Sequence, residues 1–143
     1  MRTKDIQMNR YDRQIAFQGV GLEGQSQISR FKVLVIGCGA LGNVISDCLV
    51  RSGIGFLRIL DDDIVDLSNL QRQILFTMDD IGKHKVQCAG ERLSQINPEI
   101  RLEMIRDRLQ EDSAERFFDQ MDIVVDATDS FSTSLLLNRL CVR

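Results

Sequence analysis

Four short, predominantly apolar segments recur along the chain, and a stretch with a helical pattern follows each of them. These segments are residues 33–36 (VLVI), 56–61 (FLRILD), 100–105 (IRLEMI) and 121–127 (MDIVVDA). Apolar strands that alternate with helices are typical of a parallel sheet covered on both faces. Right-handed crossovers then favour the strand order 3-2-1-4. We therefore predict an α/β fold with a doubly wound, Rossmann-like parallel sheet.

The helical stretches lie between and around these strands. After the first strand we expect helices over residues 43–53, about 79–97, 111–120 and 130–142, the second of them ending before Pro98, which cannot continue a helix. Residues 9–31 also have a helical pattern. The chain therefore divides into a predicted N-terminal helical extension, residues 1–31, and a Rossmann-like domain, residues 32–143.

Composition excludes several classes of protein. A chain of 143 residues with 43% hydrophobic and 27% charged residues can form one globular domain. Its net charge of -3 disfavours nucleic acid as the main partner. The polar N-terminus and the absence of a long apolar run predict neither a signal peptide nor a membrane partner. Four widely spaced cysteines without a C-x-x-C pair indicate reduced thiols and a cytoplasmic location.

A glycine motif, GCGALG, joins the first strand to its helix. Gly37, Gly39 and Gly42 match G-x-G-x-x-G in the strand-to-helix context that dinucleotide-binding folds use. Such glycines permit a tight turn and a close backbone approach, and the helix start offers unpaired N–H groups to a phosphate. A tight turn without a ligand is the alternative. The context favours a nucleotide, so we predict that residues 32–143 bind one.

Carboxylates follow two other strands at the same edge of the predicted sheet. Asp61 ends the second strand, at the distance from the glycines where an acidic residue can accept hydrogen bonds from ribose hydroxyls. Asp62 and Asp63 follow it, and a solvated loop is the alternative, mainly for Asp62. Asp129 follows the fourth strand. It could cap the last helix, but the strand order places it opposite the glycine loop, where a carboxylate beside phosphates can hold Mg²⁺.

The segment SNLQRQ adds polar and basic side chains. Asn69, Arg72 and Gln73 have the spacing of one face of a helical turn, and Lys85 follows in the next predicted helix. A guanidinium and an ammonium suit phosphate oxygens, although each residue alone also fits a solvated surface position. Two cations and a metal carboxylate match a triphosphate better than a dinucleotide. No Walker pattern occurs in the sequence.

The motifs RYDRQ, GCGALG, LDDDIVDLSNLQRQILF, GKHK and DATDS, within residues 10 to 130, resemble those of a known family. They are similar to the adenylyltransferases that activate ubiquitin-like sulfur carriers, namely the ThiF, MoeB and HesA proteins, which are related to ubiquitin-activating enzymes. The thiamine-pathway member, ThiF, is the most similar. The resemblance implies that the C-terminal Gly-Gly carboxylate of a carrier protein attacks the α-phosphate of Mg-ATP and releases pyrophosphate, in thiamine or molybdopterin biosynthesis. A sulfur-donor system then converts the acyl-adenylate to a thiocarboxylate.

The resemblance also implies roles for individual residues. Arg13 would reach into the site of a partner subunit, which implies a homodimer; an exposed residue of the N-terminal helix is the alternative. Asp129 would hold Mg²⁺, and Arg13, Arg72, Lys85 and Asp129 would be catalytic. The residues implied to bind the nucleotide are Gly37, Gly39, Gly42, Asp61, Asp63, Asn69, Arg72, Gln73 and Lys85.

Two departures from the family pattern affect these expectations. Ser130 stands where the family commonly has Asn. Family members also continue well beyond this length, so the resemblance implies a nucleotide-binding domain truncated at its C-terminus and slower turnover alone. The missing part would supply further strands, the carrier-binding surface, often a zinc site and sometimes a reactive cysteine. Two alternatives to adenylation are an NAD-dependent oxidoreductase and a non-catalytic, ubiquitin-activating-like scaffold subunit.

Overall fold

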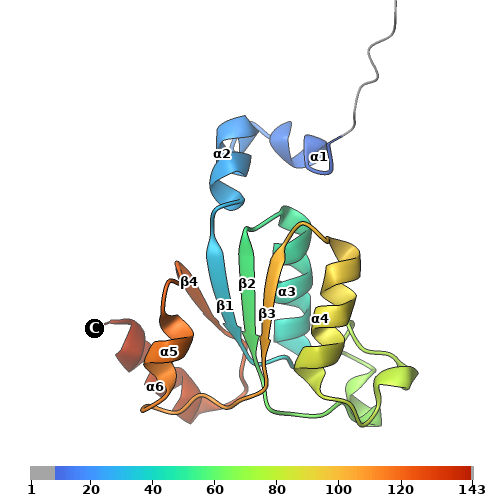
Figure 1. Cartoon of the computed structure of the whole chain (residues 1–143), viewed down its shortest axis with the longest axis vertical. Coiled ribbons are helices and arrows are strands. Elements are labelled where there is room, and N and C mark those ends of the chain that lie inside the picture. Colours follow the sequence, from blue (N-terminus) through green and yellow to red (C-terminus); the bar gives the residue numbers. More distant parts are fainter. Residues whose placement is uncertain (1–8, 143) are drawn as a thin grey trace, which may run out of the picture.

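The chain folds around one four-stranded parallel sheet (Figure 1). The computed structural model describes residues 9–142. Its strands are β1 (Lys32–Ile36), β2 (Phe56–Leu60), β3 (Arg101–Ile105) and β4 (Ile123–Asp126), in the order β3-β2-β1-β4. All three neighbouring pairs are parallel. The predicted fold class and strand order are confirmed.

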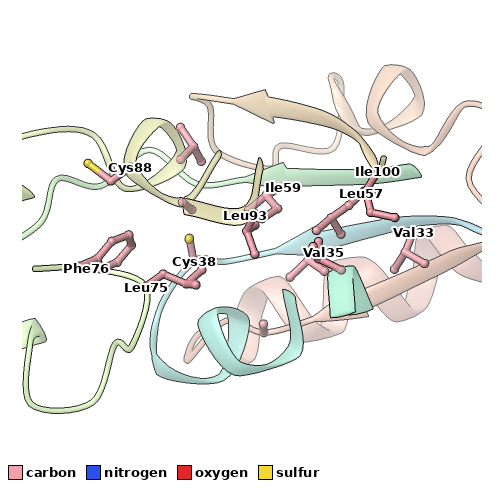
Figure 2. Packing of buried hydrophobic residues seen from close by; sticks show 14 of the residues in the cluster. Val33, Val35, Cys38, Leu57, Ile59, Leu75, Phe76, Cys88, Leu93 and Ile100 are labelled. Carbon is pink, nitrogen blue, oxygen red and sulfur yellow. The ribbon is translucent and has the colours of Figure 1, made fainter. Parts of the chain in front are cut away.

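Helices cover both faces of the sheet, which explains why β1 is apolar from Val33 to Ile36. Val33 and Val35 of β1 pack toward α3 (Ala40–Ser52) and α4 (Lys85–Ile96) in the cluster shown in Figure 2. Leu34 and Ile36 point to the other face, toward α5 (Ala114–Phe118) and α6 (Phe131–Cys141). The side chains of these four β1 residues, 33–36, are each at most 3% exposed. Burying one such side chain stabilises the fold by about 1.5–3 kcal/mol.

The edge strand β4 is less buried than its sequence predicts. β4 pairs with β1, and no strand among residues 9–142 pairs with its other edge. Ile123 is consequently 43% exposed. A continuous apolar run therefore predicted the strand correctly but overestimated its burial, because burial depends on neighbours that the run itself does not specify.

The helix predicted over residues 79–97 begins later than expected, at Lys85. Met78–Asp80 instead forms a 3-10 turn, which is closed by hydrogen bonds between Thr77 and Asp80. Gly82 then adopts a left-handed conformation with φ +84°, which a regular helix cannot contain. The C-terminal end is as predicted, since α4 ends at Ile96 before Pro98.

Residues 9–31, which have a helical pattern, form two short helices. These are α1 (Asp12–Ile15) and α2 (Gly21–Ile28), with Gly21 in the left-handed region at φ +61°. They lie beyond the end of the sheet at which the strands begin (Figure 1). The division of the chain at residue 31 stays a prediction, and residues 1–8 of the predicted extension lie outside the described part.

Hydrogen bonds attach α1 to the C-terminal ends of α3 and α4. The Tyr11 hydroxyl accepts one from Asn97 Nδ2 at 2.9 Å, and Arg10 donates to the Ile96 carbonyl at 3.0 Å. Gln14 Nε2 donates to the Ser52 carbonyl at 3.0 Å. The N-terminal segment therefore has a defined place on the main fold.

Two predictions from composition concern the cysteines and membranes. All four cysteines are free thiols in the structure, as their wide spacing predicts. Within residues 9–142, none of the helices combines the length and the apolar character that spanning a bilayer requires.

Candidate nucleotide site

A cavity of approximately 640 Å³ lies at the carboxyl ends of the strands. At this edge β1 and β4 are neighbours, and the helices that follow them, α3 and α6, cover opposite faces of the sheet. Such a position is the topological switch point, where α/β sheets bind ligands. All the predicted site residues except Gly42 and Arg13 line this cavity, namely Gly37, Gly39, Asp61, Asp63, Asn69, Arg72, Gln73, Lys85 and Asp129.

The glycine loop packs so closely that side chains would not fit. Gly37 has φ +96°, and a Cβ atom there would lie 2.8 Å from the Ala127 carbonyl oxygen. A Cβ atom on Gly42 would lie 2.0 Å from the Gly37 carbonyl oxygen. Gly42 thus permits the first turn of α3 to pack under the loop and does not itself line the cavity.

The start of α3 has the features of an anion site. Gly39 is its N-cap residue, and no side chain caps the helix. Gly39 and Ala40 line the cavity. Backbone N–H groups of a first helical turn that have no side-chain acceptor are suited to a phosphate, as is the positive end of the helix dipole.

Asn43 is a buried residue that the sequence did not single out. Its Nδ2 donates to the carbonyl oxygens of Cys38 at 2.8 Å and Gly39 at 2.9 Å. Its Oδ1 accepts from the Leu75 amide at 2.9 Å. Asn43 therefore joins the glycine loop to the segment that carries Asn69 to Gln73. A polar residue directly after the glycine motif is the signal that could have indicated it.

Asp61 supports the glycine loop from the end of β2. Its Oδ2 accepts a hydrogen bond from the Cys38 amide at 2.6 Å, and its Oδ1 accepts one from the Asp63 amide at 2.8 Å. A carboxylate has about four acceptor sites. Asp61 therefore retains capacity for the hydroxyls of a ribose while it holds the loop.

The other two carboxylates of the triplet pair with cations from distant segments. Asp62 forms an exposed ion pair with Arg108 at 3.2 Å, and Asp63 forms an ion pair with the buried Lys85 Nζ at 2.8 Å. The triplet is compact enough to hold a metal ion, since its oxygens lie within 4.8 Å of one another. Both Asp62 and Asp63 already have cationic partners, however, so a structural role explains them.

Lys85 is not the solvated position that its place on an amphipathic helix allowed. The residue is only 6% exposed, and its backbone amide also donates to the Asp63 carbonyl at 3.0 Å. The ion pair with Asp63 provides the counter-charge that a buried ammonium requires. Lys85 is thereby held with its side chain at the cavity.

The SNLQRQ segment forms the turn that its spacing predicts. The Asn69 carbonyl accepts from the amides of Arg72 at 3.1 Å and Gln73 at 2.9 Å, directly after the 3-10 turn Leu67–Asn69. Arg72 donates to the Ser68 carbonyl at 2.9 Å, which orients its guanidinium. Arg72 is exposed at the cavity, whereas Gln73 is buried there.

Asp126 fixes the turn between β4 and α6. It accepts hydrogen bonds from the Thr128 amide and hydroxyl and from the Ser134 hydroxyl. Burial raises the pKa of the Asp126 carboxyl, but the hydrogen bonds from Ser134 and Thr128 outweigh it, so the pKa lies below its usual value. Asp126 is consequently a charged anchor of the loop that presents Asp129.

Asp129 itself is not the cap of α6. Ser130 is the N-cap residue, and its hydroxyl accepts from the Thr133 amide at 3.3 Å. Asp129 is exposed at the cavity. Its carboxylate is therefore available to a ligand opposite the glycine loop.

Arg13 lies far from these residues. It is exposed on α1, at the opposite end of the sheet from the cavity (Figure 1). It cannot reach the cavity of its own chain without moving α1 off the ends of α3 and α4.

Comparisons with known proteins agree with this geometry. The model of the ThiF family matches residues 11–143. The sulfur carrier protein ThiS adenylyltransferase of Escherichia coli is 41% identical over 138 residues, which cover 96% of this chain and 55% of that protein. The sulfur carrier protein adenylyltransferase of Thermus thermophilus is 39% identical over 142 residues, 99% of this chain and 52% of that protein. The chain thus spans about half the length of these relatives.

Solved structures show the same fold. The E. coli MccB structure with ATP superposes with a TM-score of 0.85 at 33% identity, over 96% of this chain and 42% of that one. E. coli TcdA, a tRNA N6-threonylcarbamoyladenosine dehydratase in complex with ATP, gives 0.83 at 31% identity, over 86% and 51%. A matching family model over nearly all described residues, these relatives and the shared fold together show that the chain belongs to the ThiF family.

Proposed function

We propose that the protein adenylates the C-terminal glycine of a ubiquitin-like sulfur carrier protein with Mg-ATP and releases pyrophosphate. One observation carries the proposal. A single cavity collects a glycine loop with an uncapped helix start, a ribose-type carboxylate, two cations and an available carboxylate. Relatives named for the adenylation of sulfur carriers and of molybdopterin synthase support it.

The cavity provides a place for each part of ATP. The N–H groups at the start of α3 would bind phosphate oxygens, and Asp61 would accept from the ribose hydroxyls. Asn69, Arg72 and Lys85 would bind the rest of the phosphate chain. MccB and TcdA, which share the fold, were solved with ATP, which supports this choice of nucleotide.

The reaction needs alignment and charge neutralisation rather than covalent catalysis by the protein. An oxygen of the carrier's terminal carboxylate forms a bond to the α-phosphorus. The bond from that phosphorus to the bridging oxygen breaks, and the electron pair leaves with pyrophosphate. Arg72 and Lys85 would stabilise the charge that develops on the phosphates. Because Asp63 already holds Lys85, little reorganisation is required at the moment of reaction.

Asp129 fits the role of a magnesium ligand. Mg²⁺ prefers oxygen ligands and is held through one or two carboxylates beside phosphates. Asp129 supplies such an oxygen at the cavity and is not needed as a helix cap. When bound, Mg²⁺ would neutralise charge on the phosphate chain.

Arg13 supports a homodimer. Since it lies at the far end of its own sheet, it would act on a phosphate only in the cavity of a partner subunit. The proposed assembly is therefore a dimer in which each chain completes the site of the other. A sulfur-donor system would use the acyl-adenylate, and the cytoplasm, where thiols stay reduced, would be the location.

The two alternatives receive less support. An NAD-dependent oxidoreductase would leave Arg72, Lys85 and Asp129 without a common ligand, and the two relatives reported above are named adenylyltransferases. A scaffold subunit would not need all of these charged residues at one cavity.

An exchange experiment tests the proposal. Incubated with Mg-ATP, labelled pyrophosphate and a carrier ending in Gly-Gly, the protein should incorporate label into ATP, and Asp129→Ala should abolish the incorporation. Calorimetry with ATP and NAD should show binding of ATP alone. Tight NAD binding without ATP binding would favour the oxidoreductase. ATP binding without carrier-dependent exchange would favour the scaffold for this chain.

A further inference from the structure

Arg58 interrupts the apolar run of the central strand β2, and it does not line the nucleotide cavity. A charged side chain inside a strand that is covered on both faces needs partners. The Arg58 guanidinium donates to Glu103 Oε2 at 2.6 Å and to the Phe117 carbonyl at 2.7 Å. It is therefore held in place by β3 and by the end of α5.

A second cavity surrounds Arg58 at the amino ends of the strands, next to the end of α2 (Figure 1). Its volume of approximately 420 Å³ is in the size range of small-molecule pockets, and it shares no lining residue with the nucleotide cavity. In the parallel register, Lys32, Phe56 and Arg101 are direct neighbours on three adjacent strands. Their side chains therefore point to one face of the sheet, which is also the face of Arg58.

Cations outnumber carboxylates in this second cavity. The cations that line it are Arg30, Lys32, Arg58 and Arg101, and the carboxylates are Glu103 and Asp119. Within residues 9–142, Arg58 is the one cation of the four that forms an ion pair, with Glu103. Arg101 instead lies over the Phe56 ring, 5.3 Å from its centroid. A ring attracts a guanidinium through its face and accepts none of its N–H groups in the ordinary way, so Arg101 retains donors for an oxyanion.

Gln120 lies beside Lys32 in the turn that follows α5. Its Oε1 accepts a hydrogen bond from Lys32 Nζ at 3.3 Å, which leaves its Nε2 as a further donor at the cavity. In the part of the chain that the structure describes, Gln120 is the sole residue other than glycine with a positive φ, +60°. This conformation is unfavourable for a residue with a Cβ atom, and such residues often lie at ligand sites.

We propose that the second cavity binds a phosphate-type dianion, from inorganic phosphate or from a small phosphate monoester. The planar guanidinium groups of Arg30 and Arg101 match pairs of phosphate oxygens, and the Lys32 ammonium adds a compact charge. Arg58 is already neutralised by Glu103 and shapes the site. Four cations against two carboxylates leave an excess of two positive charges, which a dianion balances.

Amide NMR of the whole protein tests the inference, because it reports the two cavities through different residues. At constant ionic strength, inorganic phosphate should shift the amide signals of Gly55, Phe56 and Gln120 in a saturable manner. The signals of Gly39 and Ala40 report the nucleotide cavity and are followed separately.

Two variants remove a cation from the site. Arg101→Gln should weaken the binding of phosphate measured at Gly55 and Phe56 about 10-fold, as for the loss of a hydrogen bond to a charged group. Lys32→Gln should weaken it to a similar degree, and it decides the question if Arg101→Gln does not fold. The control is Arg139→Gln, which removes the same charge from an exposed position on α6 and should leave the affinity unchanged.

Glycerol phosphate distinguishes the two sources of the dianion. Tighter binding of this monoester than of phosphate would assign an esterified ligand, and the reverse would assign inorganic phosphate. Three results would overturn the inference. These are no saturable shift with either probe, the same shifts with chloride at equal ionic strength, and an affinity that Lys32→Gln leaves unchanged or that Arg139→Gln lowers equally.

Discussion

At the scale of single residues, Asn43 shows how one amide can hold two loops of a binding site. It is fully buried, and its side chain forms hydrogen bonds with backbone groups of Cys38, Gly39 and Leu75. The cavity therefore depends on a residue that does not line it. Its effect on a ligand is indirect, through the shape of the glycine loop and the position of the SNLQRQ turn.

Asn43→Leu should destabilise the protein by about 3 kcal/mol, because it leaves buried backbone groups without partners. The free energy of unfolding in urea measures this loss. Val44→Ala, at the exposed next position, should change the same quantity by less than about 0.5 kcal/mol. A loss below about 1 kcal/mol in Asn43→Leu would show that water replaces the side chain.

The hydrogen bond from Ser134 to Asp126 should make stability depend on pH. The pKa of Asp126 is lowered in the folded state, so its contribution is present above the ordinary value of 3.8 and is lost as the pH falls through the folded value. At pH 7, Ser134→Ala should be less stable by about 1 kcal/mol. The difference should shrink as the pH falls below about 4 in urea titrations. Ser132→Ala should show no such trend, and a difference that stays constant to low pH would contradict this role of Asp126.

The sequence predicted the residues of the site better than their contacts. Gly37, Asp61 and Asp129 were found because each follows a strand, and parallel strands end at one edge. The burial of Lys85 and Gln73 was missed, because burial depends on packing between segments that are distant in the sequence. Asn43 was missed for the same reason, since its partners lie up to 32 positions away.

At the scale of elements, the end of α3 is shaped by a glycine and an aromatic ring together. Gly53 terminates the helix at φ +86°, and a Cβ atom there would lie 2.5 Å from the Tyr11 ring. The same residue therefore ends α3 and leaves room for the docking of α1.

Gly53→Ala should destabilise the protein more than Gly82→Ala. Both glycines have positive φ, so each substitution should lose about 1 kcal/mol through the backbone. Nothing lies near a Cβ atom at Gly82, whereas the one at Gly53 meets Tyr11. Urea unfolding should show a larger loss at Gly53, and the excess should disappear when Tyr11 is also Ala. An equal loss at both positions would mean that Tyr11 moves aside freely.

Element boundaries were predicted less well than element types. The four strands and the end of α4 were predicted close to where the structure has them, because apolar runs and Pro98 are local signals. The start of α4 was predicted too early. The prediction followed the helical periodicity of the sequence and missed the turn closed by Thr77 and Asp80 and the positive φ of Gly82. The helical pattern of residues 9–31 was also correct in type, and Gly21, with positive φ, stands at the start of the second of the two helices there.

At the scale of the whole molecule, the separation of Arg13 from the cavity predicts complementation between subunits. Arg13→Ala should lower the rate of carrier-dependent exchange more than the affinity for ATP, because the guanidinium would act in the transition state. Asp129→Ala should be inactive by itself. Mixed dimers of the two variants should regain exchange, since one of their two sites has both residues. Mixtures as inactive as the separate variants would exclude action across a dimer.

The strand order also has a consequence for how the protein is made. β1 pairs with β4, although β1 ends at Ile36 and β4 begins only at Ile123. During synthesis at about 5–20 residues per second, β1 leaves the ribosome seconds before its neighbour. In that interval the edge of β1 that later pairs with β4 has no partner strand, and the nucleotide cavity lacks Asp129. We therefore expect the complete nucleotide cavity to form only after β4 has paired with β1.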